Sequence, residues 1–241
     1  MGVFFDFTGK KFVVTGAANG IGYQLMLELL EAGATVLAIS RHLQKHDALR
    51  SRYTGRLFFA EVDVNQHENL EKAVQQFVEE NGCVDGSVHS AGQSSMMPLN
   101  VWNMEKAQAV MDVNLWAGMA LLKILSKKKY SNPGMSHIFI SSVSAHKGQK
   151  GLSVYSASKG ALEAMVRCAA QELAVKKQRV NSVCFGWVET TMTKDSENIV
   201  PESLLGKGMP ADAAGILLFL LSERATWITG SNFIVDGGFL S

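Results

Sequence analysis

A tyrosine and a lysine four residues apart are the first candidates for chemistry in this 241-residue chain. Tyr155 and Lys159 belong to the run Ser-Val-Tyr-Ser-Ala-Ser-Lys-Gly, which is typical of a helix start. Because residues four apart share one helix face, the phenol and the ammonium can point into the same cleft. A nearby cation favours the phenolate and lowers the pKa of the tyrosine, as a proton donor near neutral pH requires. A core-facing tyrosine beside a solvated lysine has the same spacing, so the pair needs support from the rest of the chain.

A glycine-rich turn near the N-terminus indicates a phosphate-binding site. Residues 11–15 form a short, β-branched strand, and Gly16, Gly20 and Gly22 follow it in a Gly-x-x-x-Gly-x-Gly pattern. An amphipathic helix and a second strand at 35–39 complete a βαβ unit whose turn faces a phosphate. We expect Gly16 to let the chain leave the strand sharply, Gly20 to admit a pyrophosphate, and Gly22 to bring the helix close to the sheet. A glycine-rich turn without a ligand is the alternative.

The end of the second strand indicates which cofactor is chosen. A chain that selects NAD usually has an acidic residue about 20 positions beyond the glycines, where it binds the ribose hydroxyls. Here the position is taken by Ser40, followed by Arg41. A hydroxyl and a guanidinium bind a 2′-phosphate that an acid would repel, so the sequence predicts NADP(H) in preference to NAD(H). The alternative is that Arg41 only begins an exposed basic helix.

Strands and helices alternate along the rest of the chain. Further strands are expected at 56–60, 83–89, 136–140, 179–185 and 232–235, and the helix of Tyr155 should run to about residue 177. This pattern predicts an α/β fold with a doubly wound parallel sheet of about seven strands and helices on both faces. One domain spanning 1–241 is expected, because no linker or repeat interrupts the chain. Residues that follow strands should then meet in one cleft, namely Gly16, Ser40, Asp63, Gly92, Ser142 and Gly186.

The bulk composition argues against several classes of partner. The chain is 47% hydrophobic with a formal net charge of +1, which gives no electrostatic reason to expect nucleic acid or an anionic membrane. Its longest apolar run, 213–221, is far shorter than the ~20 residues of a bilayer span. Cys83, Cys168 and Cys184 are widely spaced among apolar neighbours, which indicates core thiols and no metal site. In the absence of a secretory signal we expect a cytoplasmic protein.

Together the motifs resemble the short-chain dehydrogenase/reductase superfamily in its compact single-domain branch, and the chain is similar to its 3-oxoacyl-(acyl-carrier-protein) reductase members. The resemblance covers essentially the whole chain, and its motifs are specific in their order and spacing. They are residues 15–22, Asp63-Val64, Ala91-Gly92, Asn114, Ser142, Tyr155-x-x-x-Lys159 and 228–238. The resemblance implies a Rossmann fold, a homo-oligomer (tetramer or dimer), and a substrate pocket between the loop after Gly92, the 143–151 loop and a lid from Thr190 to about 208.

The resemblance also implies a role for each site residue. In a reduction, Tyr155 would donate a proton to the carbonyl oxygen of a small-molecule substrate as hydride arrives from the nicotinamide, and Ser142 would position that oxygen. Lys159 would lower the phenol pKa and bind the nicotinamide ribose, while Asn114 would hold a water that links Lys159 to solvent. The implied cofactor contacts are Gly16, Asn19, Gly20, Ile21, Gly22, Ser40, Arg41, Asp63, Val64, Ser90, Ala91, Gly92, Tyr155, Lys159, Gly186, Val188 and Thr190.

Two departures from the family pattern leave alternatives open. His89 stands where the family often has asparagine, and as a residue that ends a strand it is expected to be a core histidine and not a catalytic one. Phe185 replaces the proline that precedes Gly186, so the loop is looser or the ring packs against the cofactor or the substrate pocket. Two site residues also have alternatives to a catalytic role. Asn114 is then a polar residue that bends its helix, and Ser142 is a residue that caps the turn after its strand. A catalytically silent dinucleotide-binding protein of the same fold is the rival to an enzyme.

Overall fold

Seven parallel strands form one sheet in the order β3-β2-β1-β4-β5-β6-β7. The computed structural model describes residues 5–193 and 203–241. The strands are β1 (Lys11–Thr15), β2 (Thr35–Ser40), β3 (Leu57–Glu61), β4 (Val84–His89), β5 (Ser131–Ser142), β6 (Arg179–Phe185) and β7 (Asn232–Val235). β1, β2, β4 and β6 are almost entirely buried, because helices cover both faces of a parallel sheet. The predicted fold class is confirmed.

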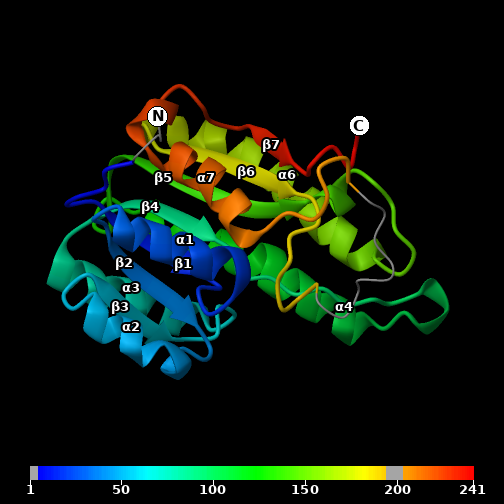
Figure 1. Ribbon diagram of the computed structural model, residues 1–241, viewed down its shortest axis with the longest axis horizontal. Helices are drawn as coiled ribbons and strands as arrows, with labels where there is room; N and C mark the ends of the chain where they lie inside the picture. Colours follow the sequence, from blue (N-terminus) through cyan, green and yellow to red (C-terminus); the bar gives the residue numbers. More distant parts are fainter. Residues whose placement is uncertain (1–4, 194–202) are drawn as a thin grey trace.

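The helices form two layers, one on each face of the sheet. α1 and α7 pack together on one face and cross in front of the strands in Figure 1, whereas α3, α5 and α6 cover the other face. α1 buries one apolar stripe, with Leu25, Met26, Leu29 and Leu30. The helices are α1 (Gly20–Glu31), α2 (Asp47–Arg52), α3 (His67–Asn81), α4 (Met104–Met111), α5 (Ala117–Leu125), α6 (Ser153–Leu173) and α7 (Pro210–Leu221).

Some element boundaries differ from those expected. β5 begins five residues earlier than predicted, at Ser131, and the ladder between β4 and β5 shifts register between Val84 and Gly86. α6 ends at Leu173 and continues as a short 3-10 turn, after which Lys177 takes a left-handed φ of 57° that ends the helical path. Of the three cysteines expected in the core, Cys184 is buried, whereas Cys168 is exposed, on the outer side of α6.

The helical segment Met104–Leu125 contains a π-helical turn, Asp112–Trp116, between α4 and α5. A π-turn inserts one extra residue per turn and leaves the local carbonyls without their regular helical partners. The whole segment, Met104–Leu125, is long and apolar enough to cross a membrane by length and composition, but half of its apolar window is buried inside the protein. Core helices pass the same test, and α5 packs on α3, β4 and β5 in this way.

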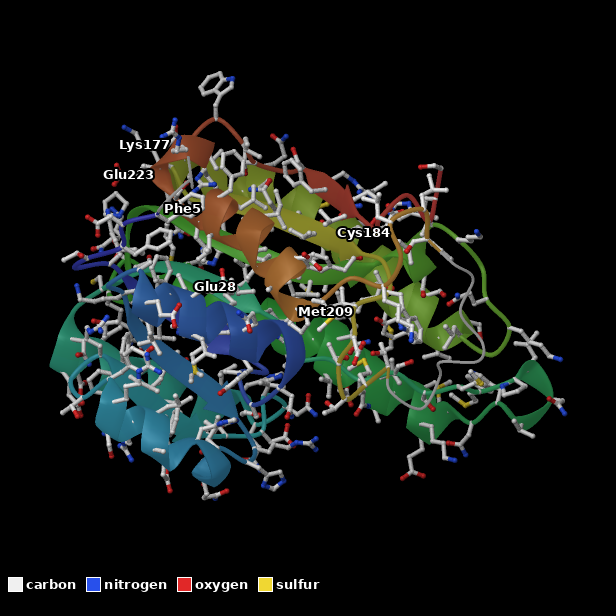
Figure 2. The ribbon with its side chains drawn as sticks, viewed as in Figure 1. Phe5, Glu28, Lys177, Cys184, Met209 and Glu223 are labelled. Carbon is white, nitrogen blue, oxygen red and sulfur yellow. The ribbon has the colours of Figure 1, made fainter. Side chains whose placement is uncertain are left out.

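β1 and β4 are neighbouring parallel strands, with Thr15 opposite His89. The strands that follow β1 in sequence extend the sheet on one side of this pair, and those that follow β4 extend it on the other side. Connections leave these two strands toward opposite sides, and a crevice opens at their carboxyl ends, where ligands bind in open α/β sheets. Figure 2 shows Cys184 and Met209 at this end of the sheet, and Phe5 and Glu223 at the opposite end. The fold therefore places the residues that follow the strands around one crevice.

Candidate active site

One cavity of about 320 Å³ lies at the carboxyl ends of the strands. Among the residues expected at the site, most line this cavity together: Gly16, Asn19, Gly20, Ile21, Ser40, Arg41, Asp63, Val64, Ser90, Ala91, Gly92, Ser142, Tyr155, Lys159, Gly186, Val188 and Thr190. Gly22 and Asn114 lie behind its wall. Nine residues of the expected lid, 194–202, fall outside the part of the chain that the structure describes.

The glycine-rich turn forms one wall of the cavity. Gly16 has a φ of 68°, and a Cβ there would lie 2.6 Å from the backbone nitrogen of Ala91, so the turn and the loop after β4 touch through bare backbone. A Cβ on Gly22 would lie 2.6 Å from the carbonyl oxygen of Gly16 and 3.1 Å from Ser90 Oγ, so this glycine lets the start of α1 lie close to the ends of β1 and β4. The first residues of α1, Gly20 and Ile21, face the cavity. A helix N-terminus behind a bare-backbone turn fits a phosphate group.

His89 is a fully buried structural residue, as expected, and it links three elements. Its Nδ1 lies 3.0 Å from Thr15 Oγ1 and its Nε2 lies 3.0 Å from the carbonyl oxygen of Val113 in the π-turn. Because a carbonyl only accepts, Nε2 carries the proton and Nδ1 accepts from the threonine hydroxyl. The same hydroxyl oxygen accepts from the backbone N–H of Ala91 at 3.2 Å. The ring therefore fixes the loop after β4 and satisfies a carbonyl of the π-turn.

Asn114 is completely buried in the π-turn and binds protein groups on each side. Its Oδ1 accepts from the backbone N–H of Gln93 at 2.8 Å, and its Nδ2 donates to the Gln93 carbonyl at 3.0 Å and to Ser158 Oγ at 2.9 Å. The side chain thus ties the loop after β4 to the helix that carries Tyr155. A Cβ on Gly92 would lie 3.3 Å from Asn114 Oδ1 and 3.7 Å from Lys159 Nζ, so both side chains lie close to this glycine.

Ser142, Tyr155 and Lys159 meet on the wall opposite the glycine-rich turn. Ser142 Oγ accepts from the backbone N–H of Ser144 at 3.2 Å, so it does cap the turn after β5, and its hydroxyl is near enough to Tyr155 to lower the pKa of the phenol. Lys159 Nζ lies 5.7 Å from the centre of the Tyr155 ring and donates to the carbonyl oxygen of Ile140 at 2.8 Å. The strand end holds both the hydroxyl and the ammonium in place beside the phenol.

Burial dominates the proton affinities of this group. It raises the pKa of Tyr155, the hydrogen bond with Ser142 opposes that change, and the thiol of Cys184 adds to it. Burial lowers the pKa of Lys159 to about 8, which the Cys184 thiol and the carboxylate of Glu163 oppose. This direction is opposite to the one expected from the lysine alone, because loss of solvent raises the pKa of the phenol more than Ser142 lowers it. The lowering of the phenol pKa by Lys159 stays a prediction.

The departure at Phe185 does not loosen the loop after β6. Phe185 is buried in the core beneath α1 and α7, and it also lines the cavity. Just beyond it, Val188 forms a parallel β-bridge with Gly208, with hydrogen bonds of 2.8 and 2.9 Å on its two sides. A Cβ on Gly186 would lie 2.7 Å from the Cα of Asp236, so the segment after β7 holds this loop closely. Of the alternatives for Phe185, the structure favours a ring that shapes the cavity.

Sequence reasoning missed several residues at the site, among them Gln93, Ser141 and Glu163. Ser141 and Gln93 line the cavity directly. Glu163 is 6% exposed and accepts a 2.6 Å hydrogen bond from Ser141 Oγ. One sequence signal was available for it, since Glu163 continues the four-residue spacing of Tyr155 and Lys159 by one more helical turn. No local pattern marks Gln93, because its contact with Asn114 joins segments that are distant in sequence.

A parallel sheet with a glycine-rich turn at its switch point, and with Ser142, Tyr155 and Lys159 across the cavity, defines an oxidoreductase of the nicotinamide dinucleotide class. Residues 16–240 match the family profile described as enoyl-(acyl carrier protein) reductase. The chain is 30% identical over 239 residues to 3-oxoacyl-(acyl-carrier-protein) reductase FabG of Chlamydia pneumoniae, covering 95% of this chain and 96% of that protein.

Solved structures agree with the sequence comparison. A short-chain dehydrogenase/reductase from Brucella melitensis, described as a glucose/ribitol dehydrogenase, superposes with a TM-score of 0.92 at 27% identity, over 98% of this chain and 99% of that one. A blue fluorescent protein from a metagenomic library, solved in complex with NADPH, superposes with a TM-score of 0.91 at 27% identity, over 98% of this chain and all of that one. The chain belongs to the short-chain dehydrogenase/reductase family and is an oxidoreductase that transfers hydride between a nicotinamide cofactor and a carbonyl or alcohol.

Proposed function

We propose that this protein uses NADP(H) to reduce a small carbonyl compound, or to oxidise the corresponding alcohol, with Tyr155 as the proton donor or acceptor. The observation that carries the proposal is the shared cavity wall of Ser142, Tyr155 and Lys159, opposite a turn shaped for a phosphate. When bound, the nicotinamide supplies the hydride. Ser142, which lines the cavity with Tyr155, holds the substrate oxygen next to the phenol, and the phenol supplies the proton.

Lys159 and Asn114 support this proton transfer from the side of the protein. The ammonium of Lys159, held by the Ile140 carbonyl, stabilises the phenolate that forms when Tyr155 gives up its proton. Asn114 fixes the loop around Gly92 and so keeps the floor of the site beside Lys159 in place. Its hydrogen bonds to Gln93 and Ser158 support a positioning role in addition to the water-holding role that the resemblance implies.

Replacing Tyr155 with phenylalanine tests the assignment. Tyr155→Phe removes the proton and keeps the ring, so we expect turnover with NADPH and a panel of ketones and 3-oxoacyl thioesters to fall at least about 10²-fold. NADPH binding, followed by fluorescence titration, should stay within a few-fold. Tyr130→Phe is the matched control, since its hydroxyl binds Glu71 away from the cavity. Equal loss of NADPH binding and turnover in Tyr155→Phe would show that the residue holds the cofactor and is not the acid.

The preference for NADP(H) over NAD(H) is supported by Ser40 and Arg41, which both line the cavity at the end of β2. Thermal unfolding with NADPH and with NADH tests it. A ligand at 100 times its dissociation constant stabilises the folded state by about 2.7 kcal/mol, which a melting experiment detects easily. We expect NADPH to stabilise more at equal concentration, and Arg41→Ala to remove the difference. Stabilisation by NADH equal to that by NADPH in the natural protein would refute the preference.

We also propose a cytoplasmic homo-oligomer, a tetramer or dimer, with a small-molecule substrate. Support for association comes from exposed apolar side chains around α4, the π-turn and α5, namely Trp102, Met104, Trp116 and Met119. The three cysteines are free thiols, which fits a reducing compartment. Sedimentation of the natural protein and of Trp116→Glu tests the association, and a monomeric natural protein would contradict it.

A further inference from the structure

Glu163 is a buried acid that the proposed reaction does not use. Tyr155, Lys159 and Glu163 follow one another at four-residue steps on α6 and therefore lie on the same helix face. The carboxylate is 6% exposed, and burial of an unpaired carboxylate would be costly. Its partners therefore show what the acid is for.

Both carboxylate oxygens of Glu163 bind the segment that ends β5. Oε1 accepts from Ser141 Oγ at 2.6 Å, and Oε2 lies 3.1 Å from Nε2 of His146, in the turn that follows the strand. Ser141 lies between two residues of the site, because Ile140 accepts from Lys159 and Ser142 lowers the pKa of Tyr155. Glu163 thus holds the strand end from the same face of α6 that carries Tyr155 and Lys159.

Accepting the proposed function, we propose that Glu163 is a positioning residue for the reaction, whose hydrogen bonds fix the strand end that carries Ser142 and whose buried carboxylate stabilises the ammonium of Lys159, one turn away on the same face of α6.

The ionisable groups around Glu163 show which anion acts on Lys159, and that anion is the carboxylate of Glu163. Lys159 faces it from α6, His146 from the turn after β5, and Cys184 from β6, where Asp236 lies near the thiol. Burial raises the pKa of Cys184 to about 12, so the thiol is neutral near pH 7. Burial lowers the pKa of Lys159 to about 8, and the charge of Glu163 opposes this change. Without that charge, the pKa of Lys159 would be lower, and less of the lysine would keep its proton near neutral pH.

His146, Glu163 and Cys184 also offer three ligand atoms within 4.8 Å of one another, which is the composition of a metal site. Two observations argue against a cation there. Both oxygens of Glu163 already accept from Ser141 and His146, and the ammonium of Lys159 lies close enough to act on Glu163 and Cys184. The contact between His146 and Glu163 accounts for the close approach of these side chains.

The test replaces the charge and keeps the shape. Glu163→Gln retains an oxygen that accepts from Ser141, and Glu172→Gln, an exposed acid on the same helix, is the matched control. The pKa of Lys159 is followed by NMR in lysine labelled with ¹³C at Cε, and the Lys159→Arg variant identifies its resonance. In parallel, kcat/KM for carbonyl reduction with NADPH is measured against pH. Glu163→Asp, which keeps the charge, separates charge from packing.

We expect the pKa of Lys159 to fall below its value of about 8 in Glu163→Gln, and the alkaline limb of the pH profile to move to lower pH with it. Glu172→Gln and Glu163→Asp should keep the natural profile. An unchanged lysine titration in Glu163→Gln, or an equal shift in Glu163→Asp, would overturn the proposal. The NMR titration does not depend on turnover, so a natural protein that reduced no carbonyl would refute the proposed function while the titration still decided the effect of Glu163 on Lys159.

If Glu163→Gln failed to fold, the natural protein would still give a decisive measurement. The side-chain carbonyl carbon of Glu163, labelled with ¹³C, should have the chemical shift of a carboxylate at pH 7. A protonated acid at that pH would overturn the proposal, because a neutral side chain cannot hold Lys159 in its charged form.

Discussion

His89 and His137 are enclosed by the sheet and its helices, and acid should therefore destabilise the protein well before its carboxylates are protonated. Both side chains are at most 2% exposed. Burial lowers the pKa of each from 6.5 to about 4, and the positive charges of Lys159 and Arg179 add to the effect at His89 and His137 respectively. Hydrogen bonds to Val113 and Gln178 act in the opposite direction and do not compensate.

The sign of the effect follows from where the protons go. Above pH 6.5 both histidines are neutral in the folded and the unfolded chain, so they make no difference. Between pH 6.5 and 4 the unfolded chain binds protons that the folded protein does not, and stability falls as the pH falls. For one histidine the full loss is about 3 kcal/mol, and between pH 7 and 5 it is about 2 kcal/mol. The two together should remove about 4 kcal/mol over that range, a large part of a typical folding free energy.

Urea denaturation at pH 7, 6 and 5 measures this slope directly. The natural protein should lose about 4 kcal/mol of unfolding free energy between pH 7 and 5, and His89→Asn should lose only about half as much. His67→Asn, at an exposed position of α3, is the control and should keep the natural slope. Comparing slopes removes the constant cost of the smaller side chain. An equal slope in the natural protein and in His89→Asn would refute the reasoning.

Three further substitutions have expected outcomes. Gly16→Ala places a Cβ 2.6 Å from the Ala91 nitrogen at a φ of 68°. In denaturation the unfolding free energy should therefore fall by about 1–3 kcal/mol, and in titration NADPH binding should weaken. Unchanged NADPH binding would contradict the role assigned to the turn. Asn114→Ala leaves the backbone groups of Gln93 unpaired, so stability should fall by about 1–3 kcal/mol and kcat should fall with it; an unchanged melting temperature would contradict this role. Leu25 is fully buried, so Leu25→Ala should lower the unfolding free energy by about 2–5 kcal/mol and leave the apparent affinity for NADPH unchanged. A weakened affinity would show that α1 has moved.

Sequence reasoning predicted those parts of the structure that depend on short, local residue patterns. The apolar, β-branched residues of β1 and β6 predict strands buried on both faces, and their bounds agree with the structure. The glycine spacing after β1 and the four-residue step from Tyr155 to Lys159 depend on a few consecutive residues, so the sequence indicates a turn and a shared helix face. The parallel topology then brings the residues that follow strands into one cavity.

Contacts between distant segments were decided only by the tertiary structure. The ring of His89 joins residues 74 and 24 positions away, Thr15 and Val113, and no local pattern announces the π-turn whose carbonyl it satisfies. Glu163 reaches back 22 positions to Ser141. The proton affinities of Tyr155 and Lys159 belong to the same category, because they depend on how much solvent the assembled protein removes. Residue types and spacing determine which groups are available, whereas packing across the sheet determines which of them meet and in which protonation state.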